Sequence, residues 1–223
     1  MFMRRLFHHT LLPECRKVRL ALHEKRLEFT EHSVDPWRQD DDLLTFNPSG
    51  ELPVLVDDDT IVCGHTVICE YLDEAYPEAP LFGGTPAIRA EARRLAQWFD
   101  EKFQREVTQH LAGEKLTRRV NANAAPDSRA LKAGRENIHT HMQYIAWLTE
   151  RRSWLAGDHL SVADLAAAAH FSLVDYSGDV PWDDHPLTKE WYVRVKSRPS
   201  FRALLRDVIQ GIPAAKVYAD LDF

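Results

Sequence analysis

The chain has 223 residues, 44% hydrophobic and 28% charged, the balance of an ordinary globular protein with one large or two small domains. Its 28 basic and 34 acidic residues give a net charge of −6, which argues against a nucleic-acid binder. No apolar run is long enough for membrane insertion, the start MFMRRLFHH lacks the apolar core of a secretory signal, and the three cysteines form no recognisable framework, so we expect a reduced, cytoplasmic setting.

The N-terminal third of the chain alternates strand and helix patterns. A polar loop or short helix follows the second strand, and an acidic turn separates the last two strands. This order indicates an α/β unit. The elements we predict are a strand at 4–9, a helix at 13–25, a strand at 27–34, strands at 53–56 and 60–63, and a helix at 65–76.

The first helix begins at Pro13, whose missing N–H costs nothing in the first helical turn. A strand that leads into a helix N-terminus is a natural site for a thiolate or a phosphate. The residues at this position are Leu11 and Leu12, which offer no side-chain hydrogen bond. Helical spacing predicts an apolar stripe of Cys15, Val18 and Leu22, with Arg16, Lys17 and Arg19 turned elsewhere.

After residue 84 the pattern becomes entirely helical. Ser161 and Asp164 form a capping-box pattern, which we interpret as a folding device. His170, in the alanine-rich helix that follows, is expected to be a hydrogen-bonded core histidine. We predict helices at 87–114, 127–151 and 161–176, and two more that start at 187 and 200.

Five segments, in this order, resemble the glutathione S-transferase superfamily. They are RKVRLAL (16–22), NPSGELPVLVDD (47–58), ICEYLDE (68–74), WLAGDHLSVADL (154–165) and VKSRPSFR (195–202). The resemblance implies an α/β plus all-α fold, with a thioredoxin-like N-terminal domain followed by a helical domain. The domains would span residues 1–82 and 87–210, with a C-terminal tail at 211–223.

The resemblance also implies where glutathione would bind. The residue before the helix-1 proline is usually Ser or Cys in this superfamily, and here it is Leu12. A Glu/Gln-Ser pair that holds the γ-glutamyl carboxylate is replaced by Gly64-His65, where the histidine is larger than serine and can be a cation. The family's cis-proline pair survives at 52–53. We therefore expect no catalytic residue and no cofactor, and a vestigial glutathione site at Thr10, Leu12, Leu52, Pro53, Gly64 and His65.

An enzymatic alternative stays open at two residues. The hydroxyl of Thr10 or the thiol of Cys15 could replace the missing side chain in a glutathione-dependent transferase, isomerase or peroxidase. The place of Cys15 on the apolar stripe favours a buried structural cysteine. A further alternative is a structural subunit that uses the fold for dimerisation.

The ending GIPAAKVYADLDF, together with the altered glutathione positions, resembles the FzlA family of FtsZ-binding division proteins of alphaproteobacteria. That resemblance implies a cytoplasmic homodimer, placed at the division site, that binds FtsZ filaments and couples them to constriction and cell-wall synthesis. The tail carries apolar residues among acidic ones, so we expect it to dock on its own domain or on a divisome partner.

Trp37 lies in the polar loop DPWRQDDD and would either anchor an interface or pack under its own loop. Arg118 and Arg119 lie in the connection KLTRRVNANAAPDS, and with Arg38 they could face an acidic filament. The histidines at 8, 9, 139 and 141 do not have the spacing of a metal site, so we predict no metal. The partner-binding residues we predict are Trp37, Arg38, Arg118, Arg119, Tyr218, Asp220, Leu221, Asp222 and Phe223, and among these Asp222 is the tail residue expected to matter most.

Overall fold

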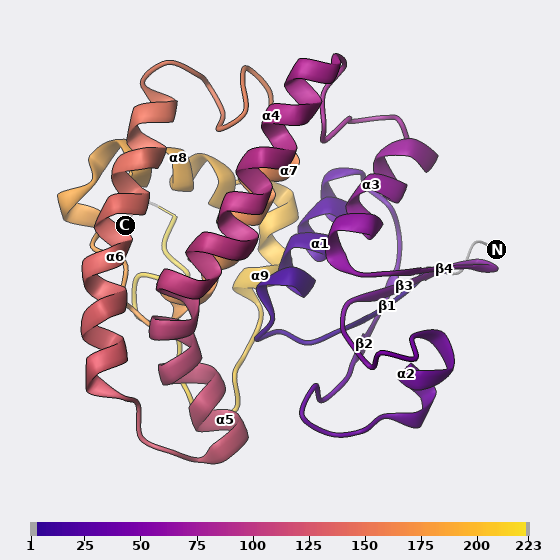
Figure 1. The fold of residues 1–223 in the computed structure, drawn as a ribbon, viewed down its shortest axis with the longest axis horizontal. Coiled ribbons are helices and arrows are strands. Elements are labelled where there is room, and N and C mark those ends of the chain that lie inside the picture. The colour runs from indigo at the N-terminus through magenta and orange to yellow at the C-terminus, as the bar shows by residue number, and fades with distance from the viewer. Residues whose placement is uncertain (1–3, 222–223) are drawn as a thin grey trace.

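The computed structural model describes residues 4–221 of the protein. Figure 1 shows a small sheet with its helices on the right and a larger group of helices on the left. The sheet has the strand order β2-β1-β3-β4, with β1 parallel to β2 and the other neighbours antiparallel. Its strands are β1 (Arg4–His8), β2 (Thr30–Ser33), β3 (Val54–Asp57) and β4 (Thr60–Cys63).

The three helices of this part cover both faces of the sheet. In Figure 1, α1 (Pro13–Glu24) and α3 (His65–Ala75) lie above the sheet, and α2 (Asp41–Phe46) lies below it. The βαβ unit followed by a β-hairpin and a helix is the predicted thioredoxin-like arrangement. The second strand is shorter than its alternating pattern at 27–34 suggested, because pairing with β1 covers only Thr30–Ser33.

Helix α1 is buried on nearly all sides, which corrects the expectation of a single apolar stripe. Cys15, Val18 and Leu22 are fully buried, as predicted, but the three neighbouring basic side chains are buried too. The reason is that α1 packs against α3 on one side and against the helical part at α7 and η3 on another. Its basic side chains therefore form internal ion pairs rather than a solvated face.

The second part of the chain is helical throughout. The helix α4 (Pro86–Gln97) continues without a break through η1 (Trp98–Thr117), which has π-type hydrogen bonding, into α5 (Arg118–Ala122). The other elements are α6 (Ser128–Thr149), α7 (Val162–Tyr176), η2 (Trp182–Asp184), α8 (Pro186–Lys196), η3 (Pro199–Phe201) and α9 (Arg202–Leu205). The domain boundaries at 82, 87 and 211 stay a prediction.

The long helical run extends past the predicted end at residue 114. The segment KLTRRVNA contains neither glycine nor proline, so nothing in it stops a helix. The run ends at Asn123, which takes the left-handed conformation with φ 47°, a common helix C-terminus. Arg118 and Arg119 are consequently helical residues of α5, and their prediction as part of a loop was wrong.

The helical core follows the predicted periodicity. Ile138, Met142, Ile145 and Leu148 of α6 are fully buried. Every residue of α7 is buried, and its N-terminus has the predicted capping box. None of the helices within residues 4–221 is long and apolar enough to cross a membrane.

The segment after α9 is fastened to the helical part by hydrogen bonds. The Tyr176 hydroxyl donates to the Ile212 carbonyl at 2.8 Å, and the Ala215 N–H donates to the Tyr176 carbonyl at 2.9 Å. Lys196 Nζ donates to the Val217 carbonyl at 3.2 Å. The chain up to Tyr218 therefore docks on its own domain, the first of the two fates considered for the tail.

Candidate functional site

The loop between β1 and α1 closes on itself through backbone hydrogen bonds. The Leu12 N–H donates to the His9 carbonyl at 3.2 Å, and the Leu12 carbonyl accepts from the Cys15 and Arg16 N–H groups. Leu12 is the N-cap of α1, but its side chain caps nothing. The helix N-terminus thus has the backbone geometry for an anion without a side-chain donor beside it.

The second and third elements of the predicted glutathione site lie across from this loop. The Leu52-Pro53 peptide bond is cis. The Gly64 N–H donates to the Pro53 carbonyl at 3.1 Å, and Gly64 caps α3 with φ 85°, a conformation that favours glycine. The structure therefore brings Pro53 and Gly64 together, and the glutathione site at these positions stays a prediction.

His65, the first residue of α3, faces the helical part. Its Nδ1 lies 3.8 Å from Asp100 Oδ2 on η1. Burial, followed by the nearby charge of Lys17, lowers the pKa of His65 to about 4. His65 is therefore neutral near pH 7, so it does not supply the cation that the sequence allowed at this position.

A polar cluster that sequence reasoning missed lies beneath His65. Lys17 Nζ is 2.6 Å from Asp100 Oδ2 and joins α1 to η1. The fully buried His170 lies 3.7 Å from Asp100 Oδ1, and its other ring nitrogen is 2.9 Å from the Thr108 hydroxyl. His170 was predicted as a hydrogen-bonded core histidine, and this is confirmed. No sequence spacing could reveal the Lys17–Asp100 pair, since the two residues come from different parts of the fold.

The carboxyl group of Asp100 remains ionised inside this cluster. Burial alone would raise the pKa of Asp100, but the nearby charge of Lys17 outweighs burial and holds it well below its usual range. The four residues Lys17, His65, Asp100 and His170 are called the inter-domain cluster below. Three of its members, Lys17, His65 and Asp100, line a cavity of about 400 Å³ beside the start of α3.

The structure treats the two possible replacement nucleophiles differently. Cys15 is fully buried, and burial strongly raises the pKa of its thiol, which disfavours the reactive thiolate. Thr10 is half-buried at the loop, and its carbonyl accepts a hydrogen bond from Arg16 Nε at 2.7 Å. Of the two residues, only Thr10 is exposed enough for its side chain to face a ligand.

A second feature, the Trp37 cleft, lies between the loop after β2 and helix α5. The Trp37 ring meets the His9 ring edge-on at 5.2 Å. Arg38 is 84% exposed in its side chain and pairs with Asp35 at 3.3 Å. The cleft has a volume of about 400 Å³ and is lined by His9, Ser33, Asp35, Trp37, Arg38, Val120 and Asn121.

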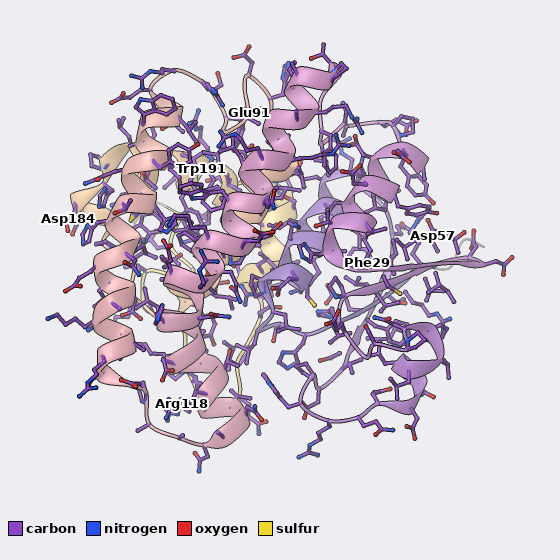
Figure 2. The ribbon with its side chains drawn as sticks, in the orientation of Figure 1. Phe29, Asp57, Glu91, Arg118, Asp184 and Trp191 are labelled. Atoms are coloured by element: carbon purple, nitrogen blue, oxygen red, sulfur yellow. The ribbon has the colours of Figure 1, made fainter. Side chains whose placement is uncertain are left out.

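The predicted arginines of the connection flank this cleft. Arg118 and Arg119 are exposed on α5, the helix that supplies Val120 and Asn121. Arg118 pairs with Glu114 at 3.0 Å and lies at the lower end of the long helical run (Figure 2). Trp37 itself is partly buried against the core, so it both packs under its loop and lines the cleft.

The tail residues divide into a buried anchor and an exposed end. Tyr218 is 1% exposed, its hydroxyl donates to the Leu204 carbonyl at 2.9 Å, and it accepts a hydrogen bond from Arg16. Tyr218 therefore holds the tail on the rest of the chain and is buried, which does not fit its predicted role as a surface residue for a partner. Asp220 and Leu221 are exposed, and the predicted residues Asp222 and Phe223 lie outside the described part of the chain.

His139, one of the histidines weighed as a metal ligand in the sequence, lies against another histidine. His139 Nδ1 lies 2.8 Å from His185 Nε2, a distance for a hydrogen bond between two rings. Among residues 4–221, no group of three or more metal-ligating side chains is clustered.

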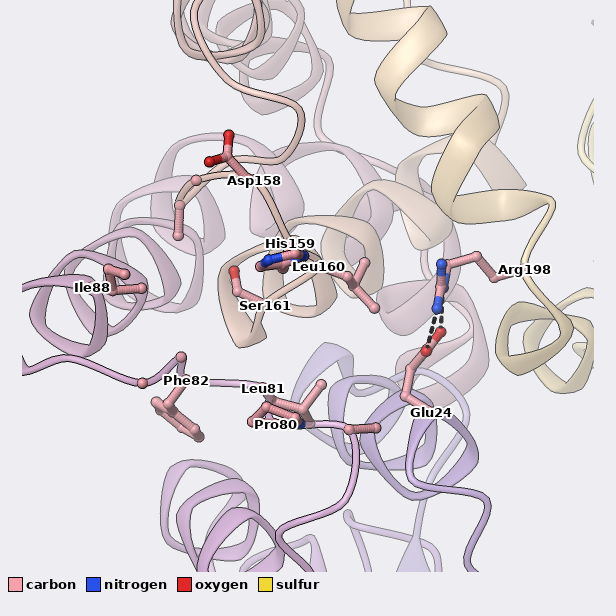
Figure 3. Close-up of a pocket in the computed structure, with 15 residues that line it drawn as sticks. Glu24, Pro80, Leu81, Phe82, Ile88, Asp158, His159, Leu160, Ser161 and Arg198 are labelled. Carbon is pink, nitrogen blue, oxygen red and sulfur yellow. Dashed lines mark hydrogen bonds and ion pairs between the residues drawn. The ribbon is translucent and has the colours of Figure 1, made fainter.

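Another cavity lies away from the glutathione positions. It has a volume of about 740 Å³ and is formed by the linker at Leu81 and Phe82, the start of α4 at Ile88 and the loop before α7. Figure 3 shows the Glu24–Arg198 ion pair, with N–O distances of 2.6 and 2.7 Å, at one end of it. Its walls are mainly apolar, and Asp158 and His159 also line it (Figure 3).

The fold and the site together define the class. A thioredoxin-like unit with a cis-proline beside the N-terminus of α3, followed by a helical domain, is a glutathione S-transferase-like fold. The family described as "Glutathione S-transferase, N-terminal domain" matches residues 6–80, and "Glutathione S-transferase, C-terminal domain" matches residues 122–199.

Comparison with individual relatives narrows the assignment within this superfamily. It is 48% identical to "FtsZ-localized protein A" of Caulobacter vibrioides over 99% of this chain and 98% of that protein. The structure of FzlA from C. crescentus superposes with a TM-score of 0.95, at 48% identity and with 99% and 100% of the two chains covered. A crystal structure described as a glutathione S-transferase from Rhodospirillum rubrum F11 has a TM-score of 0.96 and 57% identity, with 99% and 100% coverage. The chain belongs to the glutathione S-transferase superfamily and, within it, to the family of FtsZ-localized protein A.

Proposed function

We propose that this protein is a non-catalytic adaptor that binds FtsZ filaments through the Trp37 cleft and the adjoining arginines of α5. The observation that carries the proposal is the contrast between two neighbouring sites. The cleft offers an aromatic ring and exposed cations, whereas the vestigial glutathione site offers Leu12 where a thiolate needs a donor. The full-length similarity to a protein named as FtsZ-localized supports the choice of partner and a location at the division site.

The adaptor would work as a homodimer. Ile61 on β4 and Val67 on α3 are exposed at 47% and 58%, and Ile88 on α4 is exposed at 46%. Exposed apolar side chains of this kind on one subunit are suited to an isologous contact with a second copy. Such a dimer would present two filament-binding clefts, which would let it bridge filaments.

The test is co-sedimentation with FtsZ assembled in GTP, at low and high salt. Trp37→Ala, and Arg118→Asp combined with Arg119→Asp, should each reduce pelleting of the protein, because they remove the ring and the cations. Binding by exposed arginines should weaken with salt, since screening lengths fall to about 10 Å at about 0.1 M. Arg151→Asp, in the turn just after α6, is the control and should pellet as the wild type does. Unchanged pelleting of both cleft variants would exclude the Trp37 cleft.

The tail would link the dimer to constriction and cell-wall synthesis. Tyr218 anchors it to the protomer, which leaves the residues beyond for a divisome component. Asp222→Lys should leave filament pelleting unchanged and impair constriction in cells. If this variant instead loses the dimer, the tail has a structural role.

The rival function is a glutathione-dependent enzyme that uses Thr10. The names of relatives described as glutathione S-transferases favour testing it. Isothermal titration with glutathione should give no heat if the adaptor proposal is right. Saturable turnover of an electrophile that Thr10→Val abolishes would establish the enzyme instead.

A further inference from the structure

The sheet has an open edge at β2, on the opposite side from β4. The Val34 N–H donates to the His8 carbonyl at 2.9 Å. The backbone N–H and C=O groups of successive residues in a strand point to alternate sides. Those of Thr30 and His32 therefore also point toward β1, whereas those of Glu31 and Ser33 point outward. Within residues 4–221 these outward groups have no backbone hydrogen bond. They form an edge on which another strand could pair.

A groove runs beside this edge. It has a volume of about 1080 Å³ and lies between β2 with the segment before it, the C-terminal half of α1, and the end of α9. Its apolar lining comes from Leu27 and Phe29, and the Phe29 ring packs against His23 with the ring centres 5.1 Å apart. Phe29 and Glu31 share one face of the strand, so a chain added beside them would also direct alternate side chains into the groove.

The cations in the groove fall into two kinds. Arg19 is buried and bonded to both Glu31 and Asp207. Arg26 and Arg206 are exposed, and neither has an ion-pair partner among the described residues. Glu28 is an exposed carboxylate on the same lining, so the unpaired groups sum to a positive charge. This is a local basic surface on a chain whose net charge is −6.

Arg26 also lies directly after the C-terminus of α1, where glycine is the usual residue. It directly follows Lys25, the C-cap of α1, and has φ 55° in the left-handed region. Glycine is the usual residue at this place, because a side chain there costs conformational energy. The arginine is therefore present in spite of the backbone preference, and its exposed side chain reaches the groove.

We propose that the β2 groove binds an extended acidic segment of a partner protein, which adds to the sheet beside β2 and places alternate carboxylates against Arg26 and Arg206. The open backbone edge selects a polypeptide, because a nucleic acid has no matching ladder of donors and acceptors. The two unpaired arginines select acidic side chains, and Leu27 and Phe29 provide an apolar floor between them. This surface adjoins the Trp37 cleft at Ser33, which lines that cleft, whereas Arg26 and Arg206 lie outside it.

The probe is a fluorescent synthetic peptide of alternating aspartate and valine, with anisotropy as the readout. It should bind saturably, and affinity should fall about fivefold in Arg206→Glu and in Arg26→Gly. Arg26→Gly is the sharper variant, because it relieves the left-handed backbone and should raise or preserve the melting temperature while it weakens binding. Arg151→Glu, in the exposed turn after α6, is the control and should bind as the wild type does. A peptide with lysine in place of aspartate should not bind.

The backbone part of the proposal has its own test. Ser33→Pro removes an outward N–H that β1 does not use, and proline is tolerated at such positions of an edge strand. This variant should weaken binding of the probe while its melting temperature stays close to that of the wild type. A probe peptide interrupted by prolines should fail to bind the wild-type protein. The proposal is overturned if the alternating probe does not bind, or if both arginine variants bind it as the wild type does. It is also overturned if Ser33→Pro is without effect while a single-stranded oligonucleotide competes, since that result would assign the groove to a polyanion.

Discussion

Two carboxylates in the helical part of this protein, the buried Asp164 and the nearly buried Asp100, have different kinds of partners. Asp164 accepts four hydrogen bonds at 2.9–3.0 Å, from the Leu155 N–H, the Trp191 indole, and both the N–H and the hydroxyl of Ser161. Asp100 instead pairs with Lys17, while its other oxygen, Oδ1, has no hydrogen-bond partner among the described residues. The first carboxylate is satisfied within its own domain, and the second depends on a charge from the other part of the fold.

The pKa shifts of the two groups follow from this difference. Burial raises the pKa of Asp164 and outweighs its four hydrogen-bond donors, which oppose the shift. The charge of Lys17 outweighs burial at Asp100 and lowers its pKa. Asp164 therefore caps a helix within one domain, whereas Asp100 joins the two domains through its ion pair with Lys17.

The largest expected effect is at Asp164. In Asp164→Asn, the amide group would meet the Ser161 N–H, so a donor faces a donor in a buried site. The free energy of unfolding should fall by about 2–4 kcal/mol. That corresponds to a melting temperature lower by about 5–15 °C for a chain of this size, measured by circular dichroism. Asp158→Asn, on the exposed loop nearby, is the control and should melt as the wild type does.

The next effect should come from breaking the charge pair of the inter-domain cluster. Lys17→Met leaves a buried carboxylate without its cation, and the free energy of unfolding in urea should fall by about 2–3 kcal/mol. Asp100→Asn in the same chain should recover part of the loss. A double-mutant cycle measures this coupling, expected at about 1–2 kcal/mol. Strictly additive losses would show that the two residues do not stabilise each other.

The smallest effect is a change in pH dependence at His65. Its folded pKa of about 4 lies below the ordinary value of 6.5, so the unfolded chain binds a proton first as the pH falls. His65 therefore contributes stability that is complete above about pH 6.5 and is lost between about pH 6.5 and pH 4. Between pH 7 and pH 4.5, the free energy of unfolding of His65→Gln should fall by about 1–2 kcal/mol less than that of the wild type, measured in urea titrations. The exposed His159→Gln should leave the pH dependence unchanged, and equal slopes in all three proteins would contradict the assignment.

Much of the fold could be predicted from local pattern. The stripe of Cys15, Val18 and Leu22 and the capping box at Ser161 were both readable from spacing, because helical periodicity and caps depend on residues three or four apart. The extension of the long helix through Arg118 was missed, because its end depends on one left-handed residue at Asn123 rather than on a glycine or proline. For the candidate site, the loss of side-chain donors at Leu12 was visible in the sequence, while the neutral state of His65 was not.

The sequence by itself determined the order of strands and helices, the apolar faces, and which chemical groups are missing from the glutathione positions. These follow from residue type and from spacing along the chain. Tertiary structure alone decided that Lys17 meets Asp100, that Tyr218 is an internal anchor, and that Trp37 shares a cleft with α5. These pairs come from segments far apart in the chain, and burial sets their charge states and access. No local pattern shows which distant segment will cover a side chain, so only packing decided the surroundings of each of these residues.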